Sequence, residues 1–191
     1  MSVALVPEVI PPFRLAYVAP GVLRGGYPTL RNFRALSRLR LKTIVSLTPE
    51  SPTSDLKSFA LVAGVDVVHI AVQRSMPIGN SLQALLLTAV NVCIDLNNHP
   101  VYVHCLDGRR ITGLFVILLR RLQGWLPLSA ISEYWRFQFP LSSRTPAPSV
   151  TEVEKNSRDI EGFASTAVTA TTILTIPSPD RVPSWLRTAV L

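Results

Sequence analysis

The sequence predicts an α/β domain in which a central, mostly parallel β-sheet carries helices on both faces. Short apolar runs rich in β-branched residues, such as TIVSL at 43–47 and VYVH at 101–104, alternate with longer segments of helical period. This alternation is typical of parallel sheets, because strands that are buried on both faces lack polar positions. Of the 191 residues 48% are hydrophobic, which is enough apolar material for one such core.

The pattern divides the chain into three parts. Residues 1–11 are a Pro-rich lead-in, residues 12–140 hold the alternating strands and helices, and residues 141–191 form a tail. Residues 141–149 have the composition of a linker, and the rest of the tail contains Ser, Thr and Pro with little periodicity. We therefore expect the tail to be mostly irregular and poorly packed, with the β-prone segment 171–176 as a candidate edge strand.

The expected elements follow in chain order. Strands are expected at 15–18, 43–47, 65–72 and 101–104, and a turn is expected where Gly25-Gly26 is followed by Pro28. Helices are expected at 32–40, 55–63, 81–97, 111–122 and 127–137. Ser81 is the expected N-cap of the third helix, and Gly64 and Gly124 are the expected ends of the second and fourth.

The net charge of +7 belongs to the predicted domain. Residues 1–140 contain 14 Lys and Arg against 7 Asp and Glu, whereas residues 141–191 contain five of each kind. A basic surface favours anionic partners such as phosphorylated ligands, nucleic acid or acidic lipid, although a merely solvated surface has the same composition. No nucleic-acid-binding motif accompanies the charge, so nucleic acid is not an expected partner.

Membrane, metal and cofactor sites are not expected either. The most apolar stretch, residues 82–96, is too short and too polar to span a bilayer, and the N-terminus lacks the basic start of a signal peptide. The two cysteines, Cys93 and Cys105, have no partner at metal-ligand spacing, and the chain shows no disulfide framework. These features predict a cytoplasmic protein without a metal or cofactor.

The segment VYVHCLDGRRITGL, Val101 to Leu114, carries the chemistry that the sequence offers. A buried strand delivers Cys105 to the carboxyl edge of the sheet, a short glycine-containing loop follows, and a helix then begins. Such a helix N-terminus binds anions and favours the thiolate form of a cysteine beside it. Cys105 is therefore a candidate nucleophile facing a phosphate site, the alternative being a buried core thiol. Cys93 lies in the middle of an apolar helix face and is expected to be core.

Several segments in the same order carry a resemblance to a known family. They read GVLRGGYPTLRNFRAL, LRLKTIVSLTPE, NNHPVYVHC, LRRLQGW and ISEYWRFQFP. Over about 12–140 the chain resembles the atypical dual-specificity phosphatases of fungi and plants, a tyrosine-phosphatase-like group that includes inositol pyrophosphate phosphatases. The resemblance implies the cysteine-phosphatase fold, a phosphorylated substrate and attack through Cys105 with a phosphocysteine intermediate. It also implies a phosphate-binding loop formed by His104, Leu106, Asp107, Gly108, Arg109, Arg110, Ile111, Thr112 and Gly113, in which His104 supports the loop. Arg24, Glu133, Tyr134 and Arg136 match family positions and are interpreted as supporting the fold.

The loop departs from the family pattern at two positions. The family has an arginine six residues after the cysteine, where this chain has Ile111, and the following Thr112-Gly113 pair fixes the register. Isoleucine cannot bind two phosphate oxygens as a guanidinium does, and losing even one preorganised donor typically costs about 10²–10³ in rate. Asp107 adds a carboxylate that would repel a phosphate dianion. Arg109 or Arg110 could compensate by pairing with Asp107 or by reaching the ligand, the alternative being ordinary surface charge.

A third departure concerns the general acid. These phosphatases place an aspartate on the loop before the long helix, but here that loop, residues 73–80, reads QRSMPIGN and has no carboxylate. Asp66 and Asp95 are poorly placed to replace it. Two hypotheses follow. The chain is a catalytically impaired, pseudophosphatase-like protein that binds a phosphorylated small molecule, a phosphoprotein or another protein partner, or it is an active divergent phosphatase on phosphotyrosine or inositol pyrophosphate.

Overall fold

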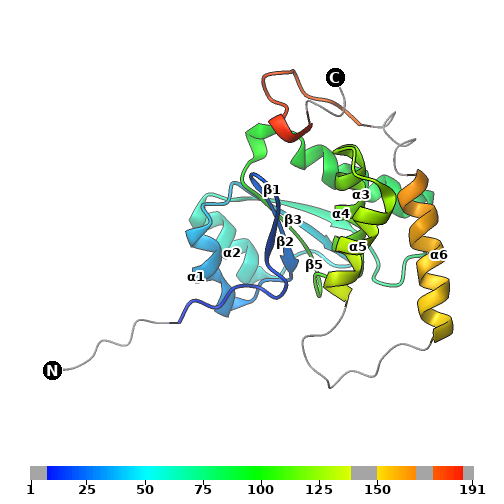
Figure 1. Ribbon diagram of the computed structural model, residues 1–191. Helices are drawn as coiled ribbons and strands as arrows, with labels where there is room; N and C mark the ends of the chain where they lie inside the picture. The colour runs from blue at the N-terminus through cyan, green and yellow to red at the C-terminus, as the bar shows by residue number, and fades with distance from the viewer. Residues whose placement is uncertain (1–7, 139–149, 167–173, 187–191) are drawn as a thin grey trace.

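The structure, a computed structural model, describes residues 8–138, 150–166 and 174–186 (Figure 1). Five strands form one sheet in the order β1-β2-β5-β3-β4. Their bounds are β1 Ala16–Ala19, β2 Val22–Gly26, β3 Thr43–Thr48, β4 Asp66–Ala71 and β5 Val101–Cys105. Only the edge pair β1 and β2 is antiparallel, and the other neighbouring pairs are parallel. The predicted mostly parallel sheet is therefore confirmed.

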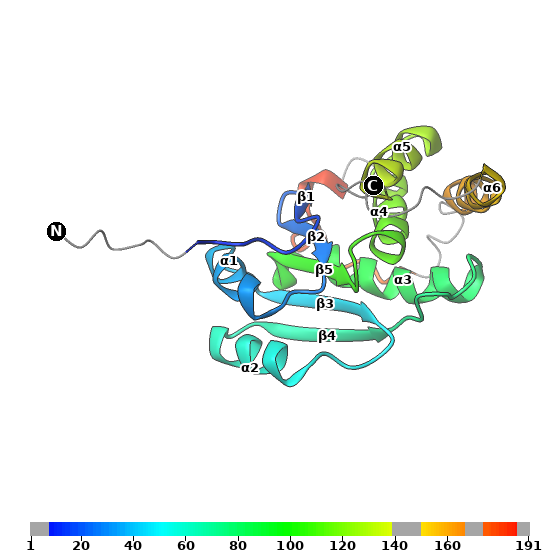
Figure 2. The ribbon, with the colours of Figure 1, turned by 90° about the horizontal axis from the view of Figure 1, so that it is seen from below.

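Helices cover both faces of the sheet, as Figure 2 shows. Helices α1 (Phe33–Arg38) and α2 (Ser54–Ala63) lie on one face, and α3 (Asn80–Cys93), α4 (Arg110–Leu122) and α5 (Pro127–Gln138) lie on the other. Because successive strand side chains alternate between faces, each central strand contributes to both cores. Tyr102 of β5 packs under α1 and α2, whereas its neighbours Val101 and Val103 pack under the other helices.

Two helix ends differ from the expectation. The third helix begins at Asn80 with Gly79 as its N-cap, not Ser81. It also ends at Cys93 and not near 97, because Asp95 caps a separate 3₁₀ turn (Leu96–Asn98) by accepting a hydrogen bond from the Asn97 N–H at 2.9 Å. An Asx cap of this kind competes with continued helix.

The glycine pair that predicted a turn lies inside strand β2 instead. Gly25 and Gly26 are paired in parallel with His104 and Cys105 of β5. A Cβ on Gly25 would lie 2.2 Å from the Tyr102 hydroxyl oxygen, so the glycine provides room for a neighbouring side chain and does not reverse the chain. The prediction was wrong because a glycine pair in the sequence does not show whether the glycines form a turn or make room for a neighbouring side chain in a strand.

The expectation of a poorly packed tail is also wrong for the residues that the structure describes there. Residues Val150–Thr166 form a 17-residue helix, α6, which lies beside α5 (Figure 1). It buries Ile160, Phe163 and Ala164, while Val182 and Leu186 further along join the same core. The spacing of 160, 163 and 164 is the helical period that the composition of the tail obscured. Residues 141–149 and 171–173, predicted as linker and as part of an edge strand, lie outside the described residues.

Candidate active site

Cys105 is the last residue of β5, which lies in the middle of the sheet between β2 and β3. Its side chain is 4% exposed, and α4 begins at Arg110 after a four-residue connection. Arg109, the N-cap residue of α4, makes no side-chain cap hydrogen bond in the described structure. The predicted order of strand, cysteine, loop and helix is present at the carboxyl edge of the sheet, where ligands bind in open α/β folds.

The loop backbone is packed tightly onto β2. Gly108 has a φ of 69°, and a Cβ there would lie 2.7 Å from backbone atoms of both Gly25 and Gly26. The Tyr27 N–H donates to the Leu106 carbonyl at 3.2 Å, and the Tyr102 hydroxyl donates to the Gly26 carbonyl at 2.7 Å. The shape of the loop therefore depends on glycines in two segments that are far apart in the sequence.

Arg24 lies against the loop and is fully buried. Its Nη2 donates to the Gly108 carbonyl at 2.8 Å, and its guanidinium stacks 3.8 Å from the centre of the Phe137 ring. Burial lowers the pKa of Arg24 to about 10, an effect that the nearby charge of Glu133 opposes. Arg24 therefore remains a cation at neutral pH.

The carboxylate of Asp107 occupies the mouth of the loop. Its Oδ1 accepts a hydrogen bond from the Arg109 N–H at 3.0 Å and lies 3.6 Å from Cys105 Sγ. Its Oδ2 forms an ion pair with Arg74 at 3.1 Å. The Arg74 side chain is 69% exposed, so solvent screening limits this pair to about 0–1 kcal/mol. Asp107 thus takes loop donors that a bound oxyanion would otherwise use.

Neither predicted arginine pairs with Asp107 through its side chain. Arg110 donates to the carbonyls of Arg74 (3.1 Å) and Met76 (2.6 Å), which ties the start of α4 to the loop before α3. Arg109 contacts Asp107 through its backbone, and its buried Nε has no hydrogen-bond partner within the described part of the chain. The side-chain partner of Asp107 is Arg74. This arginine lies in the loop before α3, the same loop that lacks a general acid.

Arg14 is a second basic residue that the sequence reasoning missed. Its Nη1 donates to the Asp107 carbonyl at 3.2 Å and its Nε to the Phe137 carbonyl at 3.0 Å. Its pKa is lowered by burial and by the nearby charge of Arg109. Arg14 lies 93 residues before Asp107 in the chain, and no local pattern signals that contact.

Ile111 lies in the apolar core at the position where the family has its arginine. It is 3% exposed and borders a hollow of about 10 Å³ whose other lining residues are Leu47, Pro49, Val72, Arg74, Cys105 and Leu106. The neighbouring Gly113 lies against Tyr134, because a Cβ there would come within 2.6 Å of the tyrosine ring. Thr112 is fully buried, and its hydroxyl has no partner in the described structure.

His104 supports the loop from beneath. It is fully buried, and its Nε2 shares a 2.7 Å hydrogen bond with the hydroxyl of Ser46 on β3. Its ring contacts Tyr27 edge-on and stacks on Tyr102. Burial lowers the pKa of His104 to about 4, so the ring is neutral near pH 7. Cys93 is also fully buried, and burial raises the pKa of its thiol, which agrees with the predicted core position.

The candidate acids lie at the other edge of the sheet. Asp66 is the first residue of β4, and Asp95 caps the turn just before β5 and forms an ion pair with Arg181. Because β4 and β5 both run parallel to β3, Asp66 and Asp95 lie at the amino-terminal ends of the strands, whereas Cys105 lies at the carboxyl-terminal end of its strand. Neither is placed to protonate a leaving group at Cys105.

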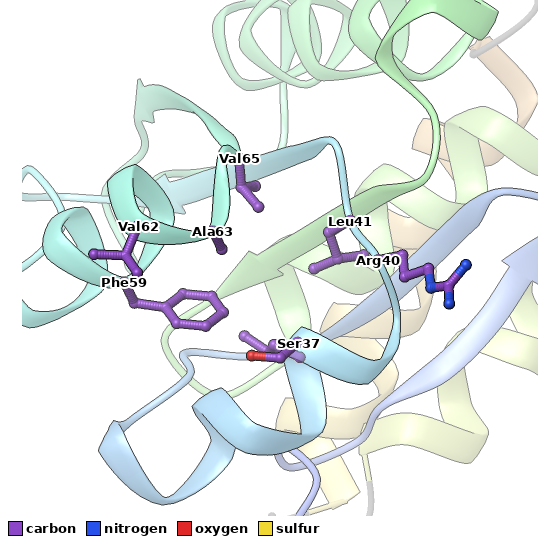
Figure 3. A pocket seen from close by; sticks show the side chains of 8 residues that line it. Ser37, Arg40, Leu41, Phe59, Val62, Ala63 and Val65 are labelled. Carbon is purple, nitrogen blue, oxygen red and sulfur yellow. The ribbon is translucent and has the colours of Figure 1, made fainter.

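A separate apolar groove of about 370 Å³ lies between α1 and α2 (Figure 3). Phe59 and Val62 of α2 face Ser37 and Leu41 across it. None of the residues that line it belongs to the 104–113 loop. Within the described ranges there is no cluster of three or more His, Cys, Asp or Glu that could hold a metal ion, and no helix there is long and apolar enough to cross a membrane.

Comparison with known proteins gives consistent matches. A model of the tyrosine phosphatase family matches residues 9–158. Inositol diphosphatase DSP4 of Arabidopsis thaliana is 36% identical over 129 residues, covering 67% of this chain and 65% of that protein. Inositol diphosphatase SIW14 of Saccharomyces cerevisiae is 32% identical over 135 residues, covering 70% of this chain and 48% of that protein. The match to each relative therefore spans less than two thirds of that relative's length.

Solved structures agree with the sequence matches. The core catalytic domain of the PP-IP phosphatase SIW14 from S. cerevisiae, in complex with citrate, has a TM-score of 0.64 at 25% identity and covers 80% of this chain and 97% of that domain. TpbA of P. aeruginosa has a TM-score of 0.61 at 21% identity, covering 84% of this chain and 91% of that chain, which shows a common fold.

Proposed function

We propose, from the premise that this chain belongs to the tyrosine phosphatase family, that its Cys105 loop binds the phosphoryl group of a phosphorylated small molecule or phosphoprotein and hydrolyses it weakly at best. The observation that carries this proposal is Ile111, which lies in the core where a phosphate-binding guanidinium is required.

Binding of an oxyanion is supported by the donors around the loop. The N-cap residue of α4 makes no side-chain cap hydrogen bond in the described structure, so the N–H groups of the first turn and its partial positive charge face the loop. Arg14 and Arg24 bond loop carbonyls, and Arg74 reaches the Asp107 carboxylate at the mouth. A phosphate that enters must displace the Asp107 carboxylate from the Arg109 N–H, and this competition weakens binding without abolishing it.

Turnover requires two elements beyond binding, a donor to the transition-state oxygens and an acid for the leaving group. The Cys105 thiolate would attack phosphorus, forming an S–P bond while the P–O bond to the leaving group breaks, and water would then hydrolyse the phosphocysteine to thiolate and phosphate. The transition state spreads charge over the equatorial oxygens, and Ile111 offers them no donor. The leaving oxygen needs a proton, but loop 73–79 before α3 has no carboxylate. Each defect lowers the rate while leaving binding possible.

A second candidate function is hydrolysis of a phosphoanhydride. It is favoured by the names of the relatives, which are inositol diphosphatases, and by the chemistry of the bond, since a phosphate leaving group needs little help from an acid. In that case Arg109, whose Nε has no partner in the described structure, would be the substitute clamp. Turnover of an inositol pyrophosphate that is lost in Cys105→Ser would support this candidate.

Calorimetric titration with tungstate, a phosphate mimic, tests the binding proposal. We expect saturable binding at one site, competed by inorganic phosphate and weakened by Arg109→Met, which removes a guanidinium of the loop itself. The matched control is Arg38→Met, which removes an exposed guanidinium on α1. The absence of any tungstate binding to the folded protein would overturn the proposal.

A further inference from the structure

The peptide unit between Gly108 and Arg109 makes a hydrogen bond on each side. Its carbonyl oxygen accepts from Arg24 Nη2 at 2.8 Å, and its N–H donates to Asp107 Oδ1 at 3.0 Å. A carbonyl and an N–H of one peptide point in opposite directions. The contact with Arg24 therefore fixes the direction of the N–H that meets the anion at the mouth of the loop.

Arg24 has no partner that would explain a buried charge by ion pairing. It is fully buried, and its Nε and Nη1 have no hydrogen-bond partner in the part of the chain that the structure describes. Arg120, which is 9% exposed, instead forms two hydrogen bonds with Glu133 at 2.6 and 3.0 Å. Buried charges are ordinarily paired in this way. Among the described residues, Arg24 instead donates to the Gly108 carbonyl and stacks on the Phe137 ring, without an ion pair.

Strand β2 supplies both the cation and the surface on which the loop lies. Arg24 is followed directly by Gly25 and Gly26, and Gly108 packs against the backbone of those two glycines. Because none of the three glycines has a Cβ, the Gly108 carbonyl comes within hydrogen-bond distance of the guanidinium. The Arg-Gly-Gly sequence of β2 is thus one structural unit with the loop of α4.

We propose that Arg24 is a positioning residue that orients and polarises the Gly108–Arg109 peptide so that its N–H binds the anion in the Cys105 loop. A cation on the carbonyl strengthens the N–H as a donor, because hydrogen bonds in series polarise one another in a low-dielectric interior. The charge of Arg24 also interacts electrostatically with Cys105, so the reactivity of this thiol gives a second readout. The proposal rests on the proposed function, since the anion is the phosphoryl group of the ligand, and it assigns Arg24 more than support of the fold.

The test compares Arg24→Met, Arg24→Gln and Arg24→Lys with the control Arg38→Met by two readouts. The first is tungstate affinity by calorimetry, and the second is the rate of Cys105 alkylation by iodoacetamide against pH, with the modified cysteine identified by mass spectrometry. The titratable and charged groups that face Cys105 include Asp107, Arg14, Arg24, Tyr102 and Tyr134, and only Arg24 changes in this series.

Arg24→Met is expected to weaken tungstate binding about tenfold and to slow alkylation of Cys105 at pH 7 about tenfold. Arg24→Lys is expected to retain part of the tungstate affinity and part of the alkylation rate that Arg24→Met loses, because lysine keeps the charge and a donor. Arg38→Met is expected to match the wild type. A purely structural role would lower thermal stability without moving the pH profile.

A folded Arg24→Met variant that stays within twofold of the wild type in both readouts would overturn the proposal. If Arg24→Met does not fold, the comparison of Arg24→Gln with Arg24→Lys decides: at least threefold lower values for Gln support the proposal, and equal values overturn it. If the wild type binds no tungstate, the proposed function fails, and the alkylation profiles alone then decide the role of Arg24.

Discussion

Three side chains of the loop determine what the site can do. Cys105 at the carboxyl end of a central strand is the proposed nucleophile, Asp107 places a carboxylate among the loop donors, and Ile111 is a buried apolar residue at the proposed position of the phosphate clamp. The carboxylate competes with the ligand, and the isoleucine withholds a donor from the transition state. A guanidinium introduced at position 111 would come close to the Asp107 carboxylate, so changes at the two positions should be interdependent.

Restoring the arginine alone should recover little activity. In Ile111→Arg the new guanidinium lies near the Asp107 carboxylate and is expected to pair with it, so phosphate release from phosphotyrosine should rise less than about tenfold. The double change Ile111→Arg with Asp107→Asn should exceed the product of the two single effects. Steady-state phosphate release measures all three variants. Independent, multiplicative effects would contradict the expected competition.

Burial of His104 predicts a dependence of stability on pH. Its pKa is about 4 in the folded protein, below an ordinary value of 6.5, because burial disfavours the charged ring. The unfolded chain therefore binds the proton first as pH falls, and stability from this group is lost from about pH 6.5 downward, by up to about 1.4 kcal/mol per pH unit. Urea unfolding at pH 7, 6 and 5 should show a smaller decline in His104→Asn. Equal declines in both proteins would contradict the prediction.

At this scale the sequence predicted the order of strand, cysteine, loop and helix, because these features lie in one short segment. It did not predict the partners of that segment. Arg24 and Arg14 contact the loop across 84 and 93 residues, and Arg74 reaches Asp107 from the loop before α3. Such contacts depend on which strands become neighbours in the sheet, and a linear pattern does not encode that order.

Among the elements, the contact between β2 and the loop before α4 matters most for the site. Strand β2 was missed in the sequence because its glycines were interpreted as a turn, although they are required for close approach of the loop. Strands β3 and β5 were predicted well, because a strand buried on both faces is largely apolar. The edge strand β4 is only partly buried, and its β-branched residues predicted it.

This contact predicts that Gly108→Ala is more damaging than a matched change elsewhere. Gly64 has nearly the same φ (67° against 69°), but a Cβ there meets no atom within 4 Å, whereas a Cβ on Gly108 would lie 2.7 Å from the backbone of β2. Gly64→Ala should therefore cost only the backbone strain of about 1–2 kcal/mol. Gly108→Ala should cost at least twice that amount in the free energy of unfolding and should also weaken tungstate binding. Similar losses for the two variants would show that the loop does not need this close approach.

On the scale of the whole molecule, the sheet with its two helical layers is extended by the C-terminal residues. Helix α6 and residues 174–186 pack onto the side that carries α3, α4 and α5. Arg121 of α4 donates to the Ala164 carbonyl at 2.9 Å, and the Leu96 N–H donates to the Arg181 carbonyl at 2.8 Å. The sequence did not predict this packing, because few apolar residues in this region lie at helical spacing and contact the core.

Removing the tail should therefore destabilise the domain. A chain truncated at Pro140 loses the burial of Ile160 and Phe163, each worth about 1.5–3 kcal/mol, and exposes the surface that they cover. We expect a lower melting temperature or loss of soluble protein, and Phe163→Ala in the full chain should cost about 3–5 kcal/mol. The exposed Leu61→Ala on α2 is the control. A truncated chain with the melting temperature of the intact protein would show that the domain ends at 140.

The central claim is that the loop binds phosphoryl groups but turns them over poorly. It is tested most directly by steady-state phosphate release from phosphotyrosine and from an inositol pyrophosphate, with Cys105→Ser measured alongside. We expect a kcat/KM below the usual range of enzymes, which begins at about 10⁴ M⁻¹ s⁻¹, for both substrates, because the missing donor alone removes about 10²–10³ in rate and no carboxylate of loop 73–79 supplies a proton. Turnover within that usual range, abolished in Cys105→Ser, would contradict it and would point to Arg109 as the clamp.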